Sequence, residues 1–200
     1  MSTQESELSP RMQLILESAA RVVAAKGMRG LTHRAVDGEA GLPVGSTSGY
    51  LRTRLALTTA LAAFISDALI DNVEGLVSRQ RAGDTTEELA AQAIELFVGW
   101  LATPTLLLAQ GELTQEAARV PEVAGALEPA EHRIRRLVRE LLTTAGENGD
   151  PDTDAEALVA AMQGVLGSAF LRPPEEREAY VRGTARRIVE AFVWLPSTPR

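Results

Sequence analysis

The sequence contains no cysteine and only two histidines, His33 and His132. Without cysteine the chain has no disulfide framework, no thiolate metal site and no cysteine nucleophile, and two isolated histidines argue against a histidine-based metal site. A phosphate-binding loop, a nucleophile elbow and a paired catalytic acid and base are also missing. We therefore expect a protein that is not an enzyme and that uses no metal or cofactor.

Signals for export or membrane insertion are lacking as well. The first eight residues, MSTQESEL, are polar and acidic and include neither a basic nor an apolar segment of the kind found in secretion signals. The apolar stretch 101–109 is interrupted by Thr103, Pro104 and Thr105, whereas a membrane span needs about 18 consecutive apolar residues. These features predict a soluble cytoplasmic protein with no membrane segment.

The net charge of −7 is unevenly distributed along the chain. Residues 1–58 contain seven basic and five acidic residues, a net charge of +2, and the remainder contains 13 basic and 22 acidic residues, a net charge of −9. This asymmetry is typical of a protein with one surface for a polyanion and a body that repels it, although many proteins segregate charge for other reasons.

Apolar residues recur at the spacing of amphipathic helices through almost the whole chain, without β-type alternation. The first predicted helix has Ser9 as its N-cap and Pro10 at its first position, and it stops at Gly27. Two short helices are predicted from Thr32 to 40–41 and over 44–51, and a long one after Thr53. Later helices are predicted at 86–102, 106–119, about 126–145, from Asp154 to about 171, and 174–194, with loops at 81–85 and 146–154.

About nine helices of these lengths predict an all-α protein. A three-helix head with a helix-turn-helix over residues 1–56 would be followed by a helical-bundle domain over 57–200, and residues 1–8 would form a disordered tail. With 45% hydrophobic residues, the chain has enough apolar material for a sizeable core.

The order of a helix, a short helix, a glycine turn and another short helix is typical of a helix-turn-helix. In that motif the second helix of the pair enters the major groove of DNA. Here it would be VGSTSGYL, residues 44–51, in which Gly45 permits close approach and the hydroxyls of Ser46, Thr47 and Ser48 can hydrogen-bond to bases. The open alternative is that this glycine- and serine-rich stretch is a flexible polar loop.

From Ile15 to Leu57 the sequence resembles, without gaps, the N-terminal domain of the TetR family of transcriptional regulators. The matching positions are Gly27, Leu31, Thr32, Arg34, Ala40, Gly41, Gly45, Ser46, Tyr50, Thr53, Arg54 and Leu57. The resemblance covers about a quarter of the chain, and beyond Leu57 only the number and length of the helices agree.

The resemblance implies binding to double-stranded DNA at a palindromic operator. It implies that some residues contact base edges and others contact phosphates, and Thr47 is added to them for its hydroxyl. The residues expected to contact DNA are therefore Thr32, Arg34, Val44, Gly45, Ser46, Thr47, Ser48, Tyr50 and Arg54. Thr32 and Thr53 could equally act only as helix caps, and Tyr50 could be a packing residue. His33 is expected to be exposed without a role.

Three positions depart from the family pattern. Gly49 replaces a common aromatic residue, Gly38 lies inside the second helix, and Pro43 replaces the usual serine cap. Each glycine costs a helix roughly 1 kcal/mol relative to alanine. These departures suggest the hypothesis that the recognition helix is frayed in the free protein and becomes ordered on DNA.

The resemblance also implies that the last two helices form a homodimer, and an apolar stripe on each helix agrees with this. The expected interface residues are Leu158, Met162, Val165, Leu166, Ala169, Phe170, Val181, Ala185, Ile188 and Phe192. The alternative is that both stripes pack inside a single chain.

Helices between about residues 57 and 145 would surround a cavity for an unidentified small-molecule effector, with mostly apolar walls. The candidate contacts are Phe64, Phe97, Trp100, Leu101, Leu108, Glu112, Gln115 and Met162, each of which could instead be a core or surface residue. Effector binding would release a repressor from its operator by changing the spacing of the two heads. The alternative function is a helical interaction module without sequence-specific DNA binding.

Overall fold

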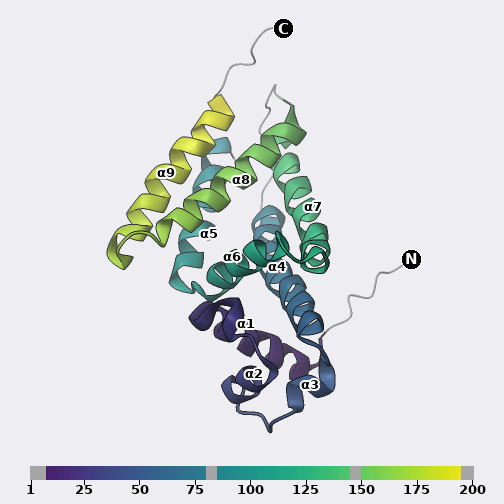
Figure 1. The fold of residues 1–200 in the computed structure, drawn as a ribbon. Coiled ribbons are helices and arrows are strands. Elements are labelled where there is room, and N and C mark those ends of the chain that lie inside the picture. The colour runs from purple at the N-terminus through teal and green to yellow at the C-terminus, as the bar shows by residue number, and fades with distance from the viewer. Residues whose placement is uncertain (1–7, 80–84, 145–149, 195–200) are drawn as a thin grey trace, which may run out of the picture. The chain divides into compact units, whose positions relative to one another are not determined.

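The computed structural model describes residues 8–79, 85–144 and 150–194, and within these ranges it contains nine α-helices and no strand (Figure 1). The helices are α1 (Pro10–Gly30), α2 (His33–Glu39), α3 (Ser46–Tyr50), α4 (Arg54–Arg79), α5 (Thr86–Ala102), α6 (Thr105–Ala117), α7 (Pro121–Thr144), α8 (Pro151–Ala169) and α9 (Pro174–Trp194). The expected all-α fold is confirmed. Most of the expected N-terminal tail, at 1–7, and the loop segments 80–84 and 145–149 lie outside the described residues.

Local sequence signals explain where the first helices begin. The Ser9 hydroxyl accepts a hydrogen bond from the backbone N–H of Met12 at 3.3 Å, and Pro10 occupies the first turn of α1, where its missing N–H has no cost. The Thr32 hydroxyl accepts a hydrogen bond from the N–H of Ala35 at 3.1 Å and so caps α2.

Two later helices differ from their expected bounds. Helix α7 begins at Pro121 and continues through Pro129, although an internal proline disfavours a helix by about 3 kcal/mol. Val123 and Leu127 of the same helix are buried, and their packing offsets that cost. Helix α8 is capped by Asp150 rather than by the expected Asp154.

The helices form two compact units. Unit 1 consists of residues 1–66 and 108–127, so it contains α1 to α3, the first part of α4, most of α6 and the start of α7. Its buried core includes Ile15, Leu16, Val23, Leu31, Val36, Leu57, Leu61, Ile65, Leu113 and Val123. The expected domain boundary after residue 56 remains a prediction.

Unit 2 consists of residues 67–107 and 128–200. Helix α9 packs against both α5 and α8, as Figure 1 shows, around a core of Ile94, Met162, Val165, Ala169, Val181 and Ala185. Ion pairs add to this packing: Arg182 on α9 binds Glu95 on α5, and Arg133 on α7 donates two hydrogen bonds to the Glu74 carboxylate on α4, at 2.6 and 2.5 Å.

Helix α4 is apolar enough to meet a length and composition test for a membrane span over Arg54–Ser78, with a mean hydropathy of 1.3. The bent pair formed by α5 and α6 passes the same test only when both helices are taken together. Leu57, Leu61 and Ile65 of α4 are fully buried inside unit 1. Burial of this kind is typical of a core helix in a bundle, which passes the test for the same reason.

Candidate nucleic-acid interface

Helices α2 and α3 pack against each other in unit 1 and are joined by the turn of residues 40–45. Gly41 (φ 66°) and Gly45 (φ 95°) adopt the left-handed backbone conformation in this turn. Residues with a Cβ atom rarely adopt that conformation, so the two glycines allow the chain to reverse within a few residues. The result is the helix-turn-helix arrangement that the sequence predicts.

A buried carboxylate holds α3 against α2. Asp37 on α2 is only 1% exposed and accepts three hydrogen bonds from the start of α3: from the N–H of Gly45 at 2.7 Å, the N–H of Thr47 at 2.8 Å and the hydroxyl of Thr47 at 2.6 Å. The N-cap position of α3 is Gly45, which has no side chain to satisfy these amides. Asp37 therefore caps α3 from the neighbouring helix.

The surroundings of Asp37 favour its charged form. Burial raises the pKa of a carboxyl group, but the hydrogen bonds from Thr47 and Gly45 outweigh burial and lower the pKa of Asp37 below its ordinary value of 3.8. The carboxylate is therefore negative at neutral pH, and its hydrogen bonds to α3 are charge-assisted.

His33 supports the other end of α3, a role that the sequence did not suggest. Its Nε2 lies 2.6 Å from the backbone oxygen of Leu51, the residue that follows α3, and with a proton on Nε2 the ring donates to that oxygen. Helix α3 has only five residues, too few to be stable alone. Contacts from α2 at both of its ends therefore position it.

Large side chains around α3 face solvent. Val44 is 81% exposed, Tyr50 50% and Leu55 42%. Arg34, on α2, is exposed as well. Apolar groups gathered in this way around one short helix are suited to contact the thymine methyl and sugar groups of DNA, while Arg34 can bind phosphate.

The hydroxyl residues of α3 have different roles. Ser46 and Ser48 are half-buried and donate to the backbone oxygens of Pro43 at 2.7 Å and Gly45 at 2.9 Å, so their oxygens can still accept hydrogen bonds. Thr47 differs from our expectation of a base contact. It is fully buried and its hydroxyl donates to Asp37, so it cannot reach DNA in this conformation.

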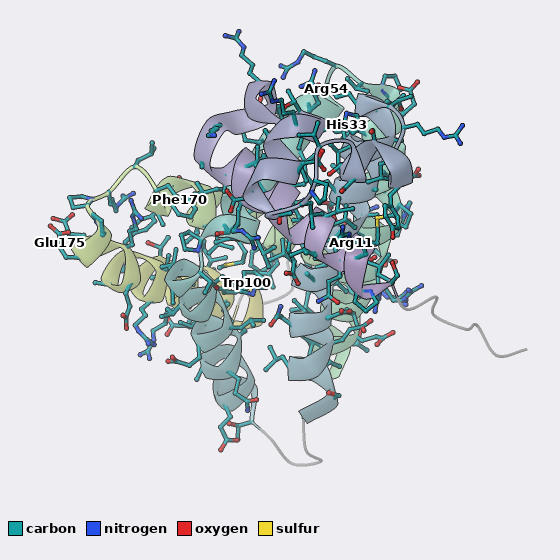
Figure 2. The ribbon with its side chains drawn as sticks, turned by 90° about the horizontal axis from the view of Figure 1, so that it is seen from below. Arg11, His33, Arg54, Trp100, Phe170 and Glu175 are labelled. Carbon is teal, nitrogen blue, oxygen red and sulfur yellow. The ribbon has the colours of Figure 1, made fainter. Side chains whose placement is uncertain are left out.

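Arg54, expected at the DNA backbone, is bonded within unit 1. Its Nη2 donates to the backbone oxygen of Met28 at 2.7 Å; Figure 2 labels this arginine. The residue is nonetheless exposed, and a guanidinium group has five N–H donors, so donors remain for a phosphate.

Met28 follows a break in α1. Gly27 has φ 65° and ψ −178°, which interrupts the helix and leaves the N–H of Met28 without a helical partner. The carboxylate of Glu112 on α6 accepts a hydrogen bond from that N–H at 2.9 Å. Glu112, which we expect to contact an effector, thus binds the backbone of α1, and its role toward an effector stays a prediction.

The other candidate effector contacts of unit 1 are not gathered into a core. Phe64 is half-buried, and Leu108 and Gln115 are exposed. Two polar atoms that we did not single out are buried without a hydrogen-bond partner among the described residues, Ser66 Oγ and Gln110 Oε1. The available signal was a polar residue directly after an apolar run, since Ser66 follows Phe64 and Ile65, and Gln110 follows the run 106–109. Such an atom costs about 1–3 kcal/mol when it is unpaired, which makes it a candidate ligand contact.

The candidate effector contacts of unit 2 are better packed. The rings of Phe97 and Trp100 meet edge to face with 5.4 Å between centroids. Phe97 and Leu101 pack against the core that contains Met162. The indole N–H of Trp100 is buried and has no acceptor among the described residues, so a ligand with an acceptor atom could satisfy it.

The expected dimer residues lie largely inside unit 2. Met162, Val165, Ala169, Val181 and Ala185 are buried in its core, Leu158 and Ile188 pack against that core, Leu166 is buried, and Phe170 and Phe192 are half-buried. The fully buried side chains among them cannot contact a partner in this conformation, whereas the half-buried ones keep exposed surface, so the dimer interface stays a prediction. The opposite face of α8 presents the exposed residues Ala157, Ala160, Gly164 and Gly167, at a spacing of three and four, and the exposed Leu171 follows the end of the helix.

The comparisons with known proteins identify the family. The profile of the tetracyclin repressor-like C-terminal domain matches residues 84–192, more than half of the chain. The search of curated proteins found no match.

Solved structures of similar fold cover nearly the whole chain. A transcriptional regulator from Rhodococcus sp. has a TM-score of 0.72 at 21% identity and covers 94% of this chain and 100% of its own. A TetR-family protein from Streptomyces coelicolor has a TM-score of 0.66 at 29% identity and covers 90% of this chain and 98% of its own. The multidrug binding protein EbrR, in complex with imidazole, has a TM-score of 0.65 at 28% identity and covers 96% of this chain and 99% of its own. The profile match, the helix-turn-helix and these likenesses together show that the chain belongs to the TetR family of transcriptional regulators.

Proposed function

We propose that this protein is a cytoplasmic, sequence-specific DNA-binding repressor that works as a homodimer and leaves a palindromic operator when a small molecule binds. The observation that carries the proposal is the surface around α3, where Val44, just before the helix, and Tyr50, at its end, face solvent, and where Asp37 and His33 hold the helix in place. A short, externally positioned helix with small residues at its start can enter the major groove.

The proposed DNA contacts divide by chemistry. Val44, Gly45, Ser46 and Ser48 face base edges, and Thr32, Arg34, Tyr50 and Arg54 bind the backbone. Thr47 does not touch DNA and acts with Asp37 to position α3. Base contacts set the preferred sequence, whereas phosphate contacts set affinity and its dependence on salt.

A second copy of the chain is proposed to pair through the exposed face of α8. On this face Ala157, Ala160, Gly164 and Gly167 are spaced by three and four residues, as in a helix-packing seam, and such small residues let two helices approach closely. Leu171, 86% exposed, would be covered by the partner. Two heads are needed because a palindromic operator repeats one half-site with two-fold symmetry.

The effector is proposed to hydrogen-bond to two polar atoms of unit 1 that are buried without a partner among the described residues, Ser66 Oγ and Gln110 Oε1. Support comes from EbrR, which has been solved with proflavin and with ethidium. Proflavin is a suitable first probe, because its amino groups can donate to Gln110 and its ring can stack on an aromatic side chain. Saturable binding that Gln110→Leu weakens is expected, and binding unaffected by that change would contradict the role of Gln110.

The decisive test selects bound sequences from a random duplex library with the purified full-length protein. We expect a palindrome whose half-sites lie roughly 34–36 Å apart or a multiple of it, with affinity that falls steeply as salt rises.

Two variants separate base contacts from phosphate contacts. Val44→Ala should relax the preference at one base pair by about 1 kcal/mol. Arg34→Gln should weaken binding to all sequences alike and reduce the salt slope by about 1. Arg11→Gln, an exposed cation at the other end of α1, is the matched control. Failure to enrich any palindrome would favour an interaction module instead.

A further inference from the structure

A polar cavity of about 510 Å³ lies in unit 1 beside the break in α1. It is lined by Lys26, Gly27, Met28, Arg29, Arg54, Glu112, Glu116 and Arg119. Its volume falls in the range of roughly 300–1,000 Å³ that is typical of small-molecule sites. Of the expected DNA and effector contacts, Arg54 and Glu112 take part in it, and both are bonded to Met28.

Cations outnumber carboxylates around this cavity. Four lining residues are basic and two are acidic. Both carboxylates have donors already, since Glu112 accepts from the N–H of Met28 at 2.9 Å and Glu116 accepts from Arg119 at 3.3 Å. Of the carboxylates that the structure describes, none is paired with Lys26 or Arg29. The cavity therefore has positive charge in excess of its internal partners.

We propose that this cavity binds a small phosphate-bearing molecule. Ammonium and guanidinium groups donate charge-assisted hydrogen bonds to phosphate oxygens, and several of them around one space can hold a group with more than one negative charge. Glu112 and Glu116 give the same wall acceptor atoms, which suit the hydroxyl or amino groups of a phosphate ester. A phosphate of the DNA backbone is the other source of the same chemistry, and it is disfavoured because the two carboxylates would repel a continuous strand.

The regulatory consequence rests on the proposed function. Arg29 and Arg54 belong to the unit that carries α3, so a bound anion there would offset positive charge that attracts DNA. Occupancy of the cavity is therefore expected to weaken operator binding at constant ionic strength. Binding of the anion itself does not depend on DNA and can be measured first.

Calorimetric titration of the full-length protein with inorganic pyrophosphate at fixed ionic strength tests the site. We expect saturable binding at one site per chain. The double variant Lys26→Gln with Arg119→Gln should raise the Kd about tenfold or more, as expected for the loss of charge-assisted hydrogen bonds. Both side chains belong to exposed residues, so the fold should persist. Glu116→Gln should lower the Kd, because it removes a negative charge from the wall.

The control is Arg11→Gln, which removes an exposed cation of unit 1 that does not line the cavity (Figure 2). No saturable binding to the wild type, or an equal loss in the control, would overturn the proposal. A second titration measures operator DNA with and without pyrophosphate. Variants that lose DNA affinity while the wild type binds no pyrophosphate would assign the cavity to the DNA backbone and likewise overturn it. Pyrophosphate binding without any operator binding would support the site and count against the proposed function alone.

Discussion

At the scale of single residues, Asp37 is the position on which the geometry of the helix-turn-helix depends most. Its carboxylate joins α2 to three donors at the start of α3, and it is almost completely buried. Because Asp37 caps α3 with a negative charge, the stability of α3 depends on that charge. Protonation at low pH and a neutral substitution should therefore both destabilise α3.

Replacing Asp37 with asparagine should destabilise the protein by about 1–3 kcal/mol at neutral pH, because a charged acceptor is lost and an amide N–H₂ is buried without an acceptor. The folded pKa of Asp37 lies below its ordinary value of 3.8, so the carboxylate stabilises the fold above that pH and loses its contribution as pH falls through the folded pKa. The difference between wild type and variant should therefore shrink in acid. Urea unfolding at several pH values measures it.

The matched control for Asp37 is Glu39→Gln on the same helix. Glu39 pairs with Arg21 at the surface, where an ion pair contributes about 0–1 kcal/mol. Equal destabilisation by the two substitutions at neutral pH would show that Asp37 has no special role in holding α3.

Two glycines of unit 1 should respond in opposite directions to alanine. Gly27 has a positive φ, and a Cβ there would lie 3.0 Å from Glu112 Oε2, so Gly27→Ala should cost about 1–2 kcal/mol. Gly38 lies in α2 with no atom within 4 Å of an added Cβ, so Gly38→Ala should stabilise by about 0.5–1 kcal/mol. Chemical denaturation compares the two. A neutral Gly27→Ala would mean that the break in α1 is not required.

At the scale of elements, α3 is shorter than the expected helix over 44–51. Its five residues include Gly49, and its own sequence contains no cap. Contacts from Asp37 and His33 therefore determine where it lies, and its intrinsic tendency to form a helix contributes little.

Amide hydrogen exchange should show α3 exchanging faster than α1 in the free protein and slowing when DNA binds. Gly49→Ala adds a Cβ into open space. It should raise the free energy of opening of α3 by up to about 1 kcal/mol and so slow its amide exchange. Gly125→Ala in α7, also into open space, should leave α3 unchanged. Equal protection of α3 and α1 without DNA would refute the frayed-helix hypothesis.

At the scale of the whole molecule, the proposed function depends on how two chains form a dimer and on how charge is distributed along each chain. Several residues of the predicted dimer seam are buried inside unit 2, so the proposed dimer uses the outward face of α8. The excess negative charge outside residues 1–58 should also repel DNA from the rest of the chain and favour contact through the head.

Gly164→Glu should convert a homodimer to monomers, because a charged side chain on the outward face of α8 would be buried in the seam. The substitution should not disturb the single chain, since no atom lies within 4 Å of an added Cβ. Gly99→Glu, at an exposed glycine of α5 with the same open surroundings, should leave the dimer intact. Sedimentation velocity distinguishes them, and a dimer that survives Gly164→Glu would place the interface elsewhere.

The sequence by itself determined the helices and the family. Apolar spacing, Ser9, Thr32 and the glycines at 27, 41 and 45 act over a few residues, so they predict where most helices begin and end without any knowledge of packing. Internal Pro129 in α7 shows the limit of such signals, because buried residues of the same helix offset a local penalty.

Only the tertiary structure decided which of the similar residues along a helix are buried and which are exposed. Thr47 and Ser48 are adjacent and chemically alike, yet one is buried against Asp37 and the other is partly open to solvent. The sequence predicts the apolar stripes of α8 and α9 as a dimer seam, with packing inside one chain as the alternative, and in the structure α9 packs against α5 and α8 around a core that includes members of both stripes. Spacing along a helix reports that a face is apolar, but what covers that face depends on residues distant in the sequence.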